Sequence, residues 1–334
     1  MGARYHGTCL AKFIVHHLSF IISMIGALII DKPEALTSHD VVARVRRAAR
    51  TRRVGHAGTL DPFATGVLVV CLERATRLLQ YLVGFHKEYL ATVRAGFATD
   101  TQDLTGKQIT PLAPSDLLSV DRVTAVLKEF VGRQEQTPPM FSAKKVAGER
   151  LYVAAREGRE VERRPIAITI SAIDLLGLQA VSADGTRDFV IRVRCSSGTY
   201  VRTLAHDIGA KLGTGAHLSA LRRTAVGPFQ IEDALTLDEV ERRGGEGTLA
   251  ASLIRPAAVL GHLPMLQIGD ADMQRVMNGR ELPLRGDEIG SEAIVPEAMR
   301  ICDKAGELLA VGEVDLRRRV VQPRVVLMTP GEVK

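Results

Sequence analysis

The chain of 334 residues contains no tryptophan and only 5 tyrosines and 9 phenylalanines. So few aromatic side chains argue against a sugar-binding platform built from stacked rings. The four cysteines lie far apart and form no CxxC pair. Their spacing indicates neither a zinc site nor a disulfide framework, and a reducing cytoplasmic compartment fits it best.

Basic residues slightly outnumber acidic ones, with Lys+Arg 44 against Asp+Glu 38 and a formal net charge of +6. Hydrophobic residues make up 46% and charged residues 25%, as in ordinary globular proteins. This composition excludes a disordered tail protein, a collagen-like repeat and a polytopic membrane protein. The length suggests two domains. The slight basicity is compatible with a polyanionic partner but does not establish one.

The N-terminal region holds one long uncharged run, Phe13–Ile30, which has no Asp, Glu, Lys or Arg. A signal anchor would contain such a run, but two histidines interrupt this one and no small-residue cleavage site follows it. Its last third, Ile25–Ile30, is typical of a strand that ends at Pro33. We therefore expect residues 1–23 to be a non-native or disordered extension, with no membrane contact.

Local patterns predict helices and strands without a regular alternation of the two. Thr37 and Asp40 form a capping box that opens a helix, and Tyr89–Ala95 alternates as a strand. Further predicted elements are a helix at 123–130, a strand at 189–195, a helix at 204–212, and strands at 308–314 and 320–327. This irregular order favours an α+β fold over a doubly wound sheet. Three glycines within 244–247 indicate a linker.

The most informative stretch is a loop of unusual composition between an arginine-rich helix and the apolar run Val67–Cys71. Residues 55–66 read GHAGTLDPFATG, with three glycines, a proline and a single carboxylate, Asp61. Taken alone, this composition describes a tight turn in which Asp61 is a cap or a turn residue. The stretch lacks the GK[ST] of a P-loop and the GxGxxG order of a dinucleotide site.

The stretch GHAGTLDPFATGVL resembles the catalytic motif of the TruB family, the bacterial tRNA pseudouridine-55 synthases. Further segments resemble that family in the same order and spacing across residues 25–230. These segments are IIDKPEALTSHDVV at 29–42, YLVGFHKEYLATVRAGFATDTQDLTG at 81–106, QTPPMFSAKKVAGERLYVAAREG at 136–158, CSSGTYVRTLAHDIG at 195–209 and GAHLSALRRTAVG at 215–227. The tail after residue 255 is similar to the PUA-like C-terminal domain of the family, with weaker motifs.

The resemblance implies a pseudouridine synthase catalytic domain over 24–250, with a mixed, mainly antiparallel sheet. It also implies an RNA-gripping insertion at 136–165 and a small β-rich, PUA-like RNA-binding domain at 255–330. The implied activity is the isomerisation of uridine 55 in the T loop of tRNA to pseudouridine. The implied protein is a cytoplasmic monomer that binds tRNA directly, without a guide RNA.

By the same resemblance, Asp61 is the catalytic carboxylate and Arg202 pairs with it, which keeps it ionised. Tyr89 would stack on the extruded uracil, while Tyr200 and Leu221 would form further walls of the pocket. Without the family, Arg202 would be taken for a surface helix residue and the other three for strand or core residues. The sequence leaves open whether Asp61 attacks C1′, adds to the base or takes a proton from C2′.

The resemblance also implies contacts with RNA. The expected RNA-binding residues are His56, Lys32, Lys144, Lys145 and Arg150. The run of arginines at 44–53 would serve phosphate contact, although a solvated helix face explains any one of them equally well.

No cofactor and no metal are expected, because the isomerisation oxidises nothing and adds no water. Asp100, Asp103 and Gly106 only faintly suggest a calcium loop, and the spacing is wrong for one. A non-catalytic protein that binds or folds tRNA on the same scaffold is the main alternative. A hydrolase acting on a nucleoside bond comes third.

Overall fold

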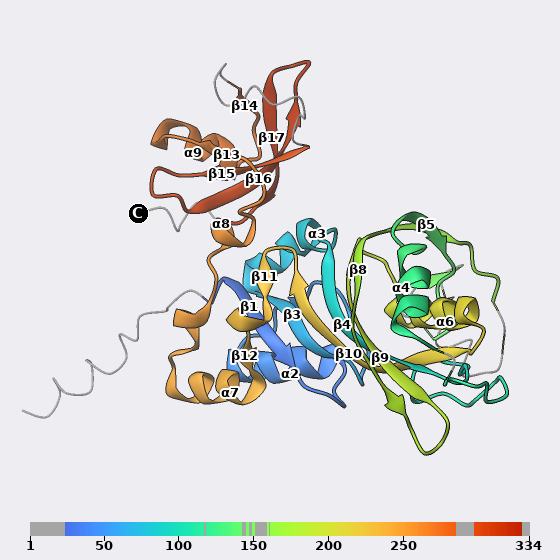
Figure 1. Cartoon of the computed structure of the whole chain (residues 1–334). Helices are drawn as coiled ribbons and strands as arrows, with labels where there is room; N and C mark the ends of the chain where they lie inside the picture. The colour runs from blue at the N-terminus through green and yellow to red at the C-terminus, as the bar shows by residue number, and fades with distance from the viewer. Residues whose placement is uncertain are drawn as a thin grey trace, which may run out of the picture.

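A computed structural model describes residues 24–116, 118–141, 145–146, 149–150, 159, 161–284 and 297–328 (Figure 1). For 145–146 and 149–150 it describes the backbone only. The extension expected at 1–23 and the predicted RNA-binding residue Lys144 lie outside the described residues. In the described part of the chain, no helix is both long enough and apolar enough to cross a membrane.

The larger part of the fold is a ten-stranded sheet with the main order β12-β1-β3-β10-β4-β9-β8-β5. Its strands are β1 (Gly26–Lys32), β2 (Val54–His56), β3 (Thr65–Leu72), β4 (Lys87–Ala95), β5 (Gly132–Gln136), β8 (Ile166–Val181), β9 (Arg187–Cys195), β10 (Ala216–Val226), β11 (Phe229–Gln230) and β12 (Leu235–Thr236). Among the described strands of this sheet, only the β1–β12 and β10–β3 pairs are parallel. The predicted α+β class with a mixed, mainly antiparallel sheet is confirmed.

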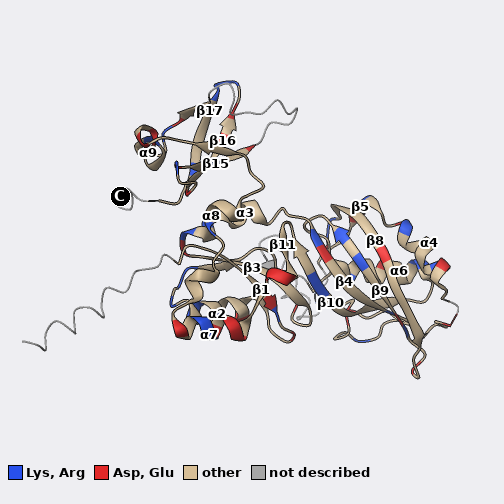
Figure 2. Ribbon diagram, turned by 60° about the vertical axis from the view of Figure 1, so that its left-hand side comes forward, with Lys and Arg blue, Asp and Glu red and all other residues tan. Residues whose placement is uncertain are grey.

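Helices cover the two halves of this sheet separately (Figure 1). Helices α2 (Ser38–Ala48) and α7 (Leu237–Glu246) pack on β1 and β3 through one apolar cluster. Helices α4 (Val120–Lys128) and α6 (Val201–Leu212) pack on β4, β8 and β9 through another. Strand β4 buries alternate residues along its whole length, whereas nearly every residue of β1 and β3 is buried. Figure 2 marks the positions of the charged residues along the strands.

Two local signals predicted from the sequence, the capping box of α2 and the glycine stop of α6, are present in the structure. Thr37 caps α2, and its backbone N–H and hydroxyl donate to the Asp40 carboxylate, which completes the capping box. Helix α6 ends at Gly213, whose φ of 73° is left-handed and suits glycine. Because β9 ends at Cys195, only a short turn separates that strand from the start of α6.

A second sheet of five strands follows in the order β13-β15-β16-β17-β14. Its strands are β13 (Met265–Gln267), β14 (Leu282–Pro283), β15 (Ala298–Cys302), β16 (Leu308–Asp315) and β17 (Val320–Val326), with helix α9 (Asp270–Met277) beside them. The 3-10 helix η1 (Glu73–Leu78) and helix α3 (Leu79–Leu82) of the first part face this sheet. Leu78 and Leu82 share one apolar core with Val311 and Leu327 of the second part. Arg74 and Arg77 also donate to the carbonyls of Leu327 and Val326, at 3.0 and 2.5 Å.

The linker predicted from the glycines within 244–247 is wrong. Gly244 and Gly245 lie inside α7, which begins with a second capping box and ends at Gly247 in a left-handed conformation. A Cβ placed on Gly244 would lie 2.5 Å from the carbonyl oxygen of Ala48 in α2. Gly244 therefore allows the close packing of two helices, whereas the sequence pattern alone is typical of a loop.

The two helical glycines provide a matched test of this packing. Gly244→Ala should lower the free energy of unfolding by about 1–3 kcal/mol, because the added methyl group forces α7 away from α2. Gly245→Ala meets no atom within 4 Å, so it should raise that free energy by about 0.5–1 kcal/mol through helix propensity. Urea unfolding of both variants measures the difference, and equal effects would contradict the close approach at Gly244.

Candidate active site

The loop between β2 and β3 carries Asp61 and is held from below by buried polar side chains. The hydroxyl of Ser38 accepts the N–H of Leu60 at 2.9 Å and donates to the Leu60 carbonyl at 3.2 Å. The Lys32 ammonium donates to the carbonyl of Pro62 at 3.1 Å. The Arg223 guanidinium donates to the Gly58 carbonyl at 3.1 Å. Side chains from β1, α2 and β10 therefore fix the backbone on both sides of Asp61.

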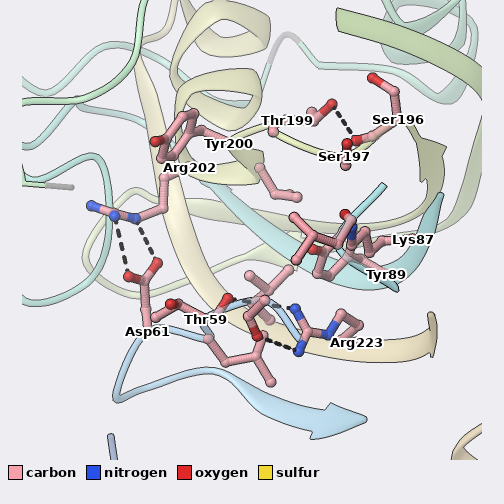
Figure 3. Close-up of a pocket in the computed structure, with 16 residues that line it drawn as sticks. Thr59, Asp61, Lys87, Tyr89, Ser196, Ser197, Thr199, Tyr200, Arg202 and Arg223 are labelled. Carbon is pink, nitrogen blue, oxygen red and sulfur yellow. Dashed lines mark hydrogen bonds and ion pairs between the residues drawn. The ribbon is translucent and has the colours of Figure 1, made fainter. Parts of the chain in front are cut away.

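Arg202, near the start of α6, forms a bidentate (two-point) ion pair with Asp61 (Figure 3). Its Nε lies 2.8 Å from one carboxylate oxygen, and a terminal nitrogen lies 3.2 Å from the other. The Arg202 side chain is 5% exposed, while 36% of the Asp61 side chain remains open. Burial raises the pKa of Asp61, and the Arg202 guanidinium opposes this shift by favouring the carboxylate.

Further groups hold the guanidinium of Arg202 in place. It donates to the carbonyls of Thr101 and Phe141 at 3.1 and 2.8 Å. A second carboxylate, that of buried Asp103, lies 3.7 Å from it. Asp103 in turn accepts hydrogen bonds from Thr101 and Thr105. In the described part of the chain, no cluster of His, Cys, Asp or Glu has the arrangement of a metal site.

A cavity of about 430 Å³ opens beside this ion pair. The predicted residues Asp61, Tyr89, Tyr200, Arg202 and Leu221 all line it. The structure therefore brings together every residue expected to form the pocket. Burial raises the pKa of the Tyr89 phenol, and Leu221 is buried on the neighbouring strand.

Lys32 does not fit its predicted contact with RNA. Its side chain is fully buried, and its ammonium donates to the carbonyls of Pro33, Leu36 and Pro62. These bonds use all three N–H donors of a lysine, which leaves none for phosphate. Burial lowers the pKa of Lys32 to about 8, with Asp61 opposing the shift. The structure assigns Lys32 to support of the loop, a role that the DKP motif does not reveal.

The other predicted RNA-binding residues lie in varied surroundings. His56 is half-buried at the end of β2, and its ring meets that of His39 edge to face at 5.6 Å. Burial lowers the pKa of His56. Lys145 and Arg150 are paired across the short strands β6 (Lys145–Val146) and β7 (Glu149–Arg150). Their contact with RNA stays a prediction.

The arginine run at 44–53 divides into two groups. Arg44 pairs with Glu241 of α7 at 2.6 Å, and Arg46 donates to the carbonyl of Val54 at 3.0 Å. These two side chains join elements of the protein. The remaining members are exposed and keep the predicted role in phosphate contact: Arg47, Arg50, Arg52 and Arg53.

Sequence reasoning missed three buried charged residues of the site. The sequence pattern connects Asp103 only with a faint calcium-loop motif. Arg223 and Lys87 both line the cavity, and the sequence held a signal for each. Residues two apart on a strand share a face, so Leu221 in the pocket implies Arg223, and Tyr89 implies Lys87.

Comparison with known proteins agrees with this geometry. Residues 46–201 match the description "TruB family pseudouridylate synthase (N terminal domain)". Residues 202–258 match "tRNA pseudouridylate synthase B C-terminal domain". Among solved structures, a crystal structure of a Cbf5-Nop10-Gar1 complex is similar, with a TM-score of 0.68 and 28% identity over 92% of this chain and 86% of that chain. The fold is that of the pseudouridine synthases.

Curated relatives show which family of pseudouridine synthases includes this chain. The tRNA pseudouridine synthase B of Geobacillus thermodenitrificans is 47% identical over 261 residues, which cover 78% of this chain and 86% of the relative. The protein of the same name from Bacillus velezensis is 39% identical over 310 residues, which cover 92% of this chain and 99% of the relative. The chain belongs to the TruB family of pseudouridylate synthases.

The anchoring of the loop can be tested at Ser38. Ser38→Ala leaves the buried N–H of Leu60 without its acceptor, so the free energy of unfolding should fall by about 1–3 kcal/mol. Ser171→Ala, at an exposed hydroxyl on β8, is the matched control and should change it by less than about 0.5 kcal/mol. Urea unfolding measures both variants. If Ser38→Ala is as stable as the unchanged protein, Ser38 does not stabilise the loop.

Proposed function

We propose that this protein isomerises uridine 55 in the T loop of tRNA to pseudouridine, with Asp61 as the catalytic carboxylate. The observation that carries the proposal is the two-point pair between Asp61 and Arg202 at the wall of a cavity. A carboxylate held in one orientation and still partly open is suited to act on a sugar or a base.

The reaction breaks the C1′–N1 bond of uridine and joins C1′ to C5 of the same uracil. N1 gains a proton and C5 loses one, so the product is an isomer of the substrate. Asp61 would act at the sugar or the base while ionised, and the guanidinium of Arg202 favours that form. Attack at C1′, addition to the base and removal of the C2′ proton are all consistent with this placement.

The cavity is of a size that suits one extruded nucleoside. Its volume of about 430 Å³ lies within the roughly 300–1,000 Å³ of small-molecule sites. Tyr89 offers an aromatic ring for stacking on the uracil, while Tyr200 and Leu221 enclose the remaining sides. A base inside a folded tRNA loop must leave its stack to enter, and we infer that His56 helps to hold the opened loop.

We propose further that the enzyme is a cytoplasmic monomer that binds the T stem-loop directly, without a guide RNA. The insertion at 136–165 would close on the RNA through Lys144, Lys145 and Arg150. A relative named tRNA pseudouridine synthase B that is aligned over 99% of its length supports tRNA as the substrate. The C-terminal part from 255 to 330 would act as a PUA-like RNA-binding domain.

A tRNA-binding or tRNA-folding protein without catalytic activity is the alternative. Binding a polyanion gains nothing from a carboxylate in the pocket, because burial of a charge costs free energy and the like charges repel. The Asp61–Arg202 pair therefore favours catalysis. Hydrolysis of the nucleoside bond, the third hypothesis, would release free uracil. A measurement of free uracil therefore distinguishes a hydrolase from an isomerase.

The activity is tested with an unmodified tRNA transcript that carries tritium at uridine C5. The unchanged protein should release tritium from one uridine of the T loop, because C5 loses its proton. Asp61→Asn should abolish release while filter binding of tRNA persists. Asp174→Asn, at an exposed carboxylate on β8, is the control and should react normally. Tight binding without release by the unchanged protein would favour the alternative.

Arg202→Lys tests the geometry of the ion pair. A lysine keeps the charge but loses the two-point contact, so the single-turnover rate should fall by about 10²-fold with little change in the Kd for tRNA. Arg202→Met removes the charge that opposes the raised pKa of Asp61, so the acid limb of its pH–rate profile should move to higher pH. Equal losses of rate and affinity would point to a simple RNA contact.

A further inference from the structure

Three cationic side chains line the described cavity, and they differ in how many of their N–H donors bind to the protein. Arg202 is held by two carboxylates and two carbonyls. Arg223 donates to the carbonyls of Val67, Thr59 and Gly58. Lys87 makes one hydrogen bond to the described residues, from its ammonium to the carbonyl of Val83 at 2.8 Å. A lysine has three N–H donors, so two remain for a ligand.

Lys87 is placed on the side of the cavity that lies across from the ion pair (Figure 3). It begins β4 and shares a face of that strand with Tyr89, two residues further on. It is 6% exposed, and no carboxylate pairs with it in the described part of the chain. Where Asp61 acts at C1′ or C2′, as two of the three routes require, the sugar of the substrate lies beside Asp61 and its base beside Tyr89. Lys87 therefore lies at the end of the cavity that receives the base.

The proposed reaction places negative charge on that base. When the C1′–N1 bond breaks, its electron pair leaves with the uracil, whose charge spreads over N1 and the carbonyl oxygens. The base must then turn until C5 faces C1′ before the new bond forms. A cation beside the detached base lowers the free energy of this state, as hydrogen-bond donors do for a developing oxyanion.

We propose that Lys87 is a catalytic cation, which donates a hydrogen bond to a uracil carbonyl oxygen and stabilises the base while it is detached from the sugar. This inference rests on the proposed function. Lys87 keeps its proton throughout. The charge disappears when C5 bonds to C1′, C5 loses its proton and N1 gains one.

Two properties of Lys87 favour the base over an RNA phosphate as its partner. Lys87 is buried and lines the cavity, whereas the phosphates of an extruded nucleotide stay continuous with RNA at the mouth. A lysine is also a point charge on a flexible stem, so its contact can follow a base that turns. Burial lowers the pKa of Lys87 to about 8, which leaves the ammonium largely charged at neutral pH.

The test compares uridine with 5-fluorouridine at the target position, under single-turnover conditions and with nucleoside analysis of the tRNA. Fluorine withdraws electrons and stabilises the detached base without help from the protein. The fluorinated base has no C5 proton to lose, so its rearranged nucleoside is the product to be measured. Lys87→Met removes the charge. Lys87→Gln also removes it but keeps a donor for the Val83 carbonyl.

Both variants should react about 10²–10³-fold more slowly than the unchanged protein with uridine, as for loss of one oxyanion donor. With 5-fluorouridine the loss of rate should be less than tenfold, and the Kd for tRNA should not change. Lys211→Met is the control because Lys211 is exposed and pairs with Glu129. Thermal unfolding of each variant separates loss of fold from loss of rate, and Lys87→Gln preserves the test if Lys87→Met does not fold.

Three results would overturn the role of Lys87. They are equal losses on the two substrates, rates that match those of the unchanged protein, and weakened tRNA binding with an unchanged rate. The last result would identify a phosphate contact instead. If the unchanged protein converts neither substrate, the proposed function itself fails, and that outcome is distinct from failure of the variants alone.

Discussion

The site depends on the two-point ion pair between Asp61 and Arg202, since each partner comes from a different half of the sheet. Asp61 stands on the loop that joins β2 to β3, and Arg202 stands on the first turn of α6. A buried guanidinium is costly unless its donors are satisfied. Asp103 and two carbonyls supply the remaining partners of Arg202, so the pair is a part of a larger polar network. The same network that orients the carboxylate thus also stabilises the contact between the two halves.

Buried polar side chains also explain how a loop rich in glycine keeps one conformation. Lys32, Ser38 and Arg223 are each at most 1% exposed, and each binds backbone atoms of the loop. Hydrogen bonds of this kind are worth most in a water-free interior, where an unpaired group would be costly. The loop therefore owes its order to the sheet and helix that pack against it, and Gly66 at its end allows the close approach of the Arg223 backbone.

Much of the fold and the centre of the site could be predicted from the sequence, because local signals and family motifs carry them. The capping box at Thr37 and the left-handed stop at Gly213 are local, and Asp61 with Arg202 stands in recognisable motifs. The sequence misassigns Lys32 because its burial and its hydrogen bond to Pro62, 30 residues further along the chain, arise only when the chain folds. Gly244 was misassigned because a glycine looks the same in a loop as at a helix crossing. Asp103 could not be placed for the reason that applies to Lys32, since its partner lies about a hundred residues away.

The apolar core that joins the two sheets fixes their position relative to each other. Sliding the second sheet against the first would expose Leu78 and Leu327 to water and break the hydrogen bonds of Arg74 and Arg77. The spacing between the β16–β17 surface and the Asp61 carboxylate is therefore set by the protein. If both surfaces contact the tRNA, as proposed above, an RNA that reaches both must match that spacing or bend to meet it. The strain of a poor fit then falls on the RNA, so the length of the RNA helix would itself contribute to substrate selection.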